Sequence, residues 1–144
     1  LLFGWFGACG LLGNVLVSRQ IDRIGAAKAV NVCLLLMSIS LMFWSFGTTV
    51  WLALLVLTPW GLGMFATNSS QQARLIHIAP ALASGSAALN TSAIYLGQAI
   101  GAAGGGWLIE HDAMMQLHWF GGVGVLLALL MSLLAARATR RAAR

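Results

Sequence analysis

The sequence predicts an all-α membrane protein, and three observations lead to this fold class. Hydrophobic residues make up 60% of the 144 residues and charged residues only 8%, with a mean hydropathy of +0.88. Soluble domains usually carry about 25% charged residues. Long apolar runs divide the chain, each close to the roughly 20 residues that a membrane-spanning helix requires. The basic residues fall between these runs and at the end of the chain.

Five apolar segments are expected to cross the bilayer as one helical bundle. Short connections should make successive helices antiparallel neighbours. We expect the chain to be a fragment with a shortened first helix, because Leu1 already lies in an apolar run and no methionine precedes it. The run also lacks the basic start and cleavage site of a signal peptide. The expected helices are about 1–17, 29–46, 50–67, 83–109 and 117–136.

The positions of Lys and Arg predict the orientation. All 8 lie in the first expected loop, the third expected loop and a basic tail at 137–144. The second loop is uncharged, and the fourth carries Glu110, His111 and Asp112. Because cytoplasmic loops are enriched in Lys and Arg, the basic loops and the tail are expected in the cytoplasm. The tail would then meet anionic lipid headgroups, so the net charge of +5 does not require nucleic acid as a partner.

The segment Asn90–Ile109 combines small and polar residues on different helical faces. At about 100° per residue, Gly97 and Gly101 share a face with Asn90, while Tyr95 and Gln98 lie on a neighbouring face. Small residues let membrane helices approach closely. The candidate helix-packing residues are Gly97, Gly101, Gly104 and Gly105.

Neutral polar, aromatic and thioether side chains are the candidates for contact with a solute. Trp60, Met64 and Asn68 recur every fourth residue beside Pro59, which is expected to bend its helix. Such groups suit an uncharged or amphipathic organic solute. Each of them could equally pack between helices. The full candidate set is Asn14, Trp60, Met64, Asn68, Asn90, Tyr95 and Gln98.

Two motifs resemble the major facilitator superfamily. The run Ser18–Lys28 matches the family's Gly-x-x-x-Asp-Arg-x-Gly loop motif at Asp22, Arg23 and Gly25, with Ser18 in place of the first glycine. The run Gly97–Gly106 is similar to the glycine-rich motif of proton-coupled drug antiporters, or to the repeat-related copy of that motif in span eleven, with Ala102 where the motif has proline. The chain therefore resembles spans eight to twelve, a partial C-terminal half, of a bacterial drug, sugar or nucleoside efflux transporter.

This resemblance implies a secondary active transporter that exports a small organic solute or drug by alternating access, with protons as the coupling ion. It implies an inner-membrane location, a first half of the transporter as the partner of this chain, and a cytoplasmic latch at Asp22, Arg23 and Gly25. No expected span has an ionisable residue in its middle, so coupling would reside mainly in the first half.

An enzyme is not expected, because no acid, base or nucleophile constellation lies within the spans. His77 and His118 are too far apart in the sequence to suggest a metal site. No cofactor is expected either. A different class of function remains open, namely a non-transporting membrane subunit or scaffold that docks a partner through its small-residue helix face.

Overall fold

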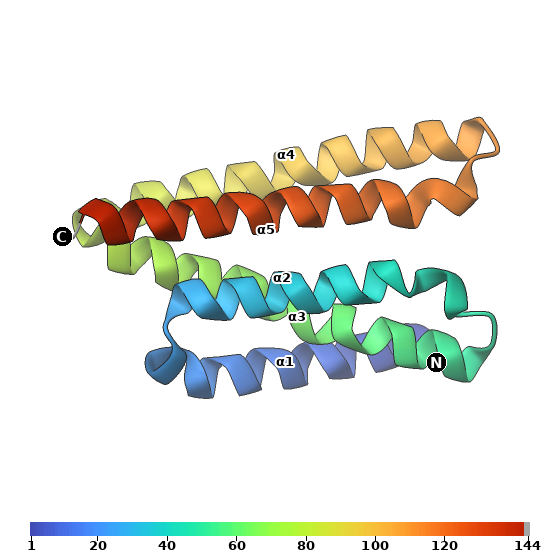
Figure 1. Ribbon diagram of the computed structural model, residues 1–144, viewed down its shortest axis with the longest axis horizontal. Helices are drawn as coiled ribbons and strands as arrows, with labels where there is room; N and C mark the ends of the chain where they lie inside the picture. The colour runs from blue at the N-terminus through green and yellow to red at the C-terminus, as the bar shows by residue number, and fades with distance from the viewer. Residues whose placement is uncertain (143–144) are drawn as a thin grey trace.

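A computed structural model describes residues 1–142 and shows a bundle of long helices (Figure 1). Short 3-10 turns precede three of these helices, at Trp44–Phe46, Pro80–Leu82 and Met114–Gln116. No strand occurs within this described part of the chain, which confirms the predicted all-α class. The long helices are α1 (Leu2–Ile24), α2 (Ala26–Met42), α3 (Val50–Ile78), α4 (Ala83–Glu110) and α5 (Leu117–Ala142).

Three of the helices are longer than the apolar runs that predicted them. The helix α1 continues from Val17 to Ile24, and α3 continues from Thr67 to Ile78. The added residues are mostly polar. The apolar runs therefore end before these residues, although the hydrogen bonding of the helical backbone continues through them. The helix α5 likewise extends beyond 136 to Ala142, and residues 143–144 of the expected tail lie outside the described part.

Arg74 lies inside α3 and is buried, which corrects its assignment to the third loop. The polar run that surrounds it reads as a loop in the sequence, yet it forms the last turns of the helix.

Membrane-spanning length and hydropathy single out a subset of these helices. Within residues 1–142, Leu2–Ile24, Val50–Ile78 and Met114–Thr139 are long and apolar enough to cross a bilayer. Ala26–Met42 is apolar but shorter, at 17 residues. The helix α4 has sufficient length at 28 residues, but its glycine, hydroxyl and amide residues lower its hydropathy. An all-helical membrane protein is supported, although two of the expected spans do not meet these criteria.

The helix α3 forms the centre of the bundle, because it packs along both α1 and α2, while α5 lies against α2. The contact of α1 with α3 is close at Gly13, where a Cβ atom would lie 2.7 Å from the Cα of Leu62. The α2–α3 contact is equally close at Gly63, where a Cβ would lie 2.6 Å from the backbone oxygen of Cys33. Ser40 reinforces this second contact by donating a 2.6 Å hydrogen bond to the carbonyl of Val56.

The helix α4 is the least enclosed of the long helices. It touches α3 and α5, and Leu108 is its single buried residue. Residues 91–103 are all exposed. In a membrane protein the missing cover comes from lipid or from other protein, so this helix has a large surface available for further contacts.

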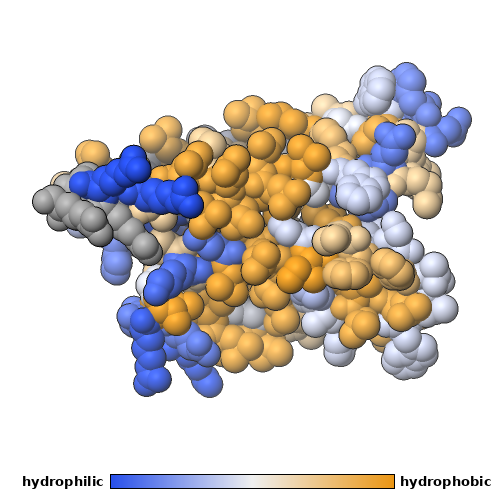
Figure 2. Space-filling view, viewed as in Figure 1, coloured by the Kyte–Doolittle hydropathy of each residue, from blue (hydrophilic) through white to orange (hydrophobic). Residues whose placement is uncertain are grey.

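The helices alternate in direction, so the basic residues gather at one end of the bundle. This basic end comprises the α1–α2 turn, the end of α3 and the end of α5 (Figure 1). Figure 2 shows hydrophobic residues across the middle of one face and hydrophilic residues at its two ends. Glu110, His111 and Asp112 lie at the opposite end, where α4 finishes.

Candidate substrate-facing surface

A stripe of side chains along α3 contains three of the candidate solute contacts. Trp60 donates its indole N–H to the sulfur of Met64 at 3.4 Å, and Gln72 donates to Oδ1 of Asn68 at 3.4 Å. The spacing of four residues places these four side chains along one side of the helix. Met64, Asn68 and Gln72 are exposed and Trp60 is half-buried, so the stripe remains accessible in this chain.

Hydrogen bonds join this part of α3 to the helices on either side. Asn90 of α4 donates from Nδ2 to Oδ1 of Asn68 at 3.4 Å. Ser69, the next residue of α3, donates to Oδ1 of Asn14 on α1 at 2.9 Å. The three helices α1, α3 and α4 are therefore linked through neutral polar groups at one level of the bundle.

Two further candidates lie on α4 without such links. Tyr95 is 66% exposed, and Gln98 is also exposed. Neither side chain has a hydrogen-bond partner within the described residues. Their part in binding a solute stays a prediction, as it does for the other five candidates.

The predicted packing glycines of α4 divide into two groups. A Cβ atom on Gly104 would collide with the ring of Phe120, and one on Gly105 would lie 3.6 Å from the side chain of Leu117, both on α5. At Gly97 and Gly101 nothing lies within 4 Å of such an atom. The second pair forms no helix contact within residues 1–142, so its packing role stays a prediction.

The Asp22–Gly25 turn joins α1 to α2 at the basic end. Gly25 has φ +85°, a conformation that residues with a side chain rarely adopt, and its N–H donates to the carbonyl of Ile21 at 2.8 Å. Asp22 and Arg23 are exposed, and neither forms an ion pair within the described chain. Gly25 therefore allows the chain to reverse between α1 and α2, while the latch role of the turn stays a prediction.

Sequence reasoning missed several residues that this surface uses. Ser69 and Gln72 extend the polar set beside Asn68, and the spacing of four residues from Asn68 to Gln72 could have identified the second. Trp5 of α1 donates its indole N–H to Oγ1 of Thr58 at 2.9 Å. The sequence gives no indication of this pairing, because it depends on how α1 and α3 align.

The surface offers hydrogen-bond donors, acceptors and apolar contacts, with no acid or base among its predicted residues. Within residues 1–142, no group of His, Cys, Asp and Glu could hold a metal ion. Such a set of side chains can bind an organic solute through hydrogen bonds and aromatic contact.

Comparison with known proteins supports the family resemblance. The chain is 28% identical over 130 residues, or 90% of its length, to YbcL of Bacillus subtilis (strain 168), an uncharacterized MFS-type transporter. MFS denotes the major facilitator superfamily. The chain spans 33% of the length of this relative. No family model and no solved structure matches the chain. The chain is thus similar to part of a transporter of this superfamily, in agreement with the resemblance of its motifs.

Proposed function

We propose that this chain is the C-terminal part, spans eight to twelve, of a secondary active transporter that exports a small organic solute. The observation that carries the proposal is the linked polar surface of α1, α3 and α4, where Asn68 joins Asn90 and Ser69 joins Asn14. Helical transporters bind their solutes between two halves that move against each other. The exposed length of α4 would face the other half, and the similarity to an MFS-type transporter agrees with this arrangement.

The charge pattern and the motifs support the proposed coupling ion, membrane orientation and cytoplasmic latch. Proton coupling would depend on groups outside this chain, because its three acidic residues are exposed near helix ends. The basic end would face the cytoplasm of a bacterial inner membrane. The Asp22–Gly25 turn would act as a latch that holds one state of the transporter closed on that side.

Reconstitution tests the proposal. The natural protein that contains this chain is placed in lipid vesicles, and solute flux is measured with and without an imposed pH gradient. Tyr95→Ala and Gln98→Ala are expected to change the solute preference while the amount of folded protein stays constant. Ile100→Ala, an exposed apolar position on the same helix, is the control. Equal loss of flux and folded protein in the first two variants would contradict a solute-binding role.

The latch requires a separate test at the basic end. Asp22→Asn should lower the rate of flux without lowering expression, because it removes the negative charge of an exposed turn. Asp112→Asn, an equal change at the opposite end, is the control. Unchanged flux in Asp22→Asn would remove the latch from the proposal.

A scaffold is the second candidate function, and one observation favours it. Gly97 and Gly101 present an open, small-residue face with nothing within 4 Å of an added Cβ, which suits close docking of another helix. A scaffold would produce no solute flux in the vesicle experiment. Replacing Gly101 by leucine would then abolish recovery of a co-purified partner.

A further inference from the structure

A buried arginine lies at the basic end of the bundle, away from the surface described above. Arg74 of α3 is only 6% exposed. Its guanidinium donates from Nη1 to Oγ of Ser132 at 2.8 Å and from Nη2 to the carbonyl of the same residue at 3.2 Å. Ser132 of α5 in turn donates to Oδ1 of Asn31 on α2 at 2.6 Å. The hydrogen-bond partners of this cation are therefore neutral.

No carboxylate balances this charge within the described residues. The acidic side chains Asp22, Glu110 and Asp112 are all exposed, and Arg74 takes part in no ion pair with them. Asp22 is at the same end of the bundle but belongs to α1, which contributes nothing to the lining of the cavity beside Arg74. A buried cation is costly unless an anion pairs with it. Arg74 therefore has no negatively charged partner among the residues that the structure describes.

A cavity of about 450 Å³ lies between α2, α3 and α5, and both Arg74 and its partner Ser132 belong to its lining. Its size falls in the range of small-molecule sites. Polar groups lie beside Arg74, and the rest of the lining is mostly apolar, so the cavity suits a ligand with one anionic group and an apolar part. Its lining includes Thr67, Gln71, Arg74, Ala128, Met131 and Ser132.

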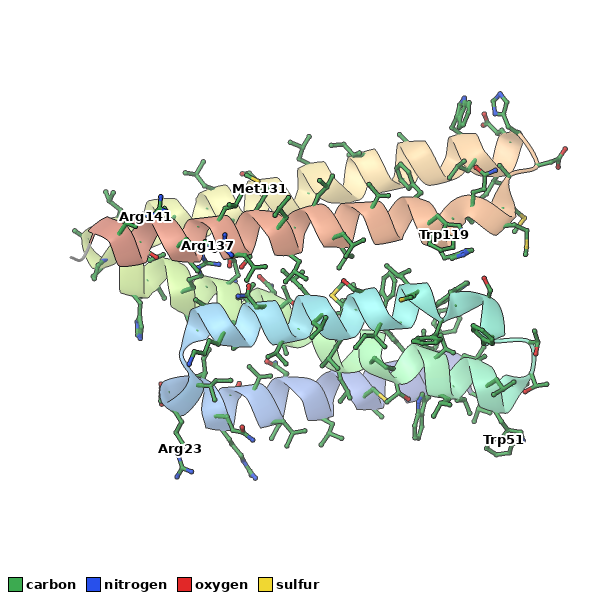
Figure 3. The ribbon with its side chains drawn as sticks, in the orientation of Figure 1. Arg23, Trp51, Trp119, Met131, Arg137 and Arg141 are labelled. Atoms are coloured by element: carbon green, nitrogen blue, oxygen red, sulfur yellow. The ribbon has the colours of Figure 1, made fainter. Side chains whose placement is uncertain are left out.

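The surroundings of the cavity add further positive charge. Arg137 and Arg141 lie on the last turns of α5, at the same end as Arg23 (Figure 3). Met131, which lines the cavity, lies earlier on the same helix. Basic pockets between membrane helices on the cytoplasmic side bind the headgroups of anionic lipids, and the planar donors of arginine match a phosphate oxyanion.

We propose that the Arg74 cavity binds a phosphate oxyanion, with an anionic phospholipid headgroup as the source and its acyl chain along the apolar lining. Inorganic phosphate shares the binding chemistry and forms a separate arm of the test. This lipid site does not depend on transport, so a negative result in the binding test would not contradict the proposed transport function.

The test measures binding to the purified natural protein in a neutral detergent by native mass spectrometry. The probes are phosphatidylglycerol, phosphatidylcholine of the same acyl length, and inorganic phosphate. Phosphatidylglycerol is expected to bind at least about tenfold more tightly than phosphatidylcholine. Both lipids offer a phosphate to Arg74, but the quaternary ammonium of phosphatidylcholine cancels the charge of its phosphate and is repelled by the neighbouring arginines. Saturation by inorganic phosphate alone, with no gain from the lipid, would overturn the lipid as the source.

Three variants separate a ligand site from a purely structural arginine. Arg74→Gln should lose the preference for phosphatidylglycerol, and Arg74→Lys should keep part of it. Ala128→Leu fills the cavity while Arg74 stays in place, so it should also weaken lipid binding about tenfold. Arg19→Gln removes an exposed charge of α1, which does not line the cavity, and should leave binding unchanged.

The proposal is overturned if Ala128→Leu binds phosphatidylglycerol as the unaltered protein does. It is also overturned if Arg19→Gln and Arg74→Gln lose binding to the same extent, since a general surface charge would then explain the preference. If Arg74→Gln does not fold, Ala128→Leu still tests whether the cavity binds the lipid, because this variant retains Arg74.

Discussion

Replacing Gly13 by alanine is expected to disturb the contact between α1 and α3. The added Cβ would lie 2.7 Å from the Cα of Leu62, whereas ordinary contact begins at 3.4 Å. The obstructing atoms belong to the backbone of α3, so no side-chain rotation can relieve the clash and the helices must separate. Overpacking of this kind costs about 1–3 kcal/mol. Separation would also weaken the neighbouring hydrogen bond from Ser69 to Asn14.

Thermal unfolding in detergent, followed by tryptophan fluorescence, measures this effect. Gly7→Ala is the matched control, because it lies on the same helix and nothing lies within 4 Å of an added Cβ. Alanine favours helix more than glycine by up to about 1 kcal/mol, so the control should unfold at the same temperature or slightly higher. Equal unfolding temperatures for Gly13→Ala and Gly7→Ala would refute the close α1–α3 contact.

Three further changes test other parts of the structure. Ser132→Ala should lower the free energy of unfolding by about 1–3 kcal/mol, because Arg74 loses a buried partner; Ser38→Ala, which loses only a bond within its own helix, should change it little. Gly25→Ala should cost about 1 kcal/mol in a chemical unfolding experiment, because its φ of +85° is strained for a residue with a side chain. Gly85→Ala, inside α4 with nothing within 4 Å of an added Cβ, should leave the stability unchanged or slightly higher. Asn90→Ala should increase hydrogen exchange near the start of α4, because it removes the bond to Asn68; unchanged exchange there would contradict that link.

The fold class could be predicted from the sequence because apolar runs of membrane length leave few alternatives to helices. The ends of the helices could not be predicted as well. Hydropathy falls after Thr67 although α3 continues to Ile78, since a helix can extend beyond the apolar region into a polar environment. Arg74 was missed as a buried residue for this reason, and its partner Ser132 is 58 positions away in the sequence.

The candidate site could be predicted only in part, because residue spacing on one helix does not identify the helix that it faces. The spacing of Trp60, Met64 and Asn68 marked a stripe on α3, and the structure adds hydrogen bonds along it. The glycine spacing of α4 suggested a packing face, and a Cβ added to Gly104 would indeed meet Phe120 of α5. The sequence did not mark Gly13 and Gly63, where an added Cβ would lie less than 3 Å from the backbone of a neighbouring helix. Which glycines meet a neighbour depends on the arrangement of the helices, and this information is not local in the sequence.

The sidedness of the bundle ends is the most direct test of the whole account. Lys28→Cys and Thr139→Cys place thiols at the basic end and Asp112→Cys places one at the other, while the native Cys9 and Cys33 are buried. The variants are treated in intact cells with a maleimide that does not cross membranes. The account predicts labelling of Asp112→Cys in intact cells and labelling of Lys28→Cys and Thr139→Cys only after the membrane is opened. Labelling of Lys28→Cys and Thr139→Cys from opposite sides would contradict it.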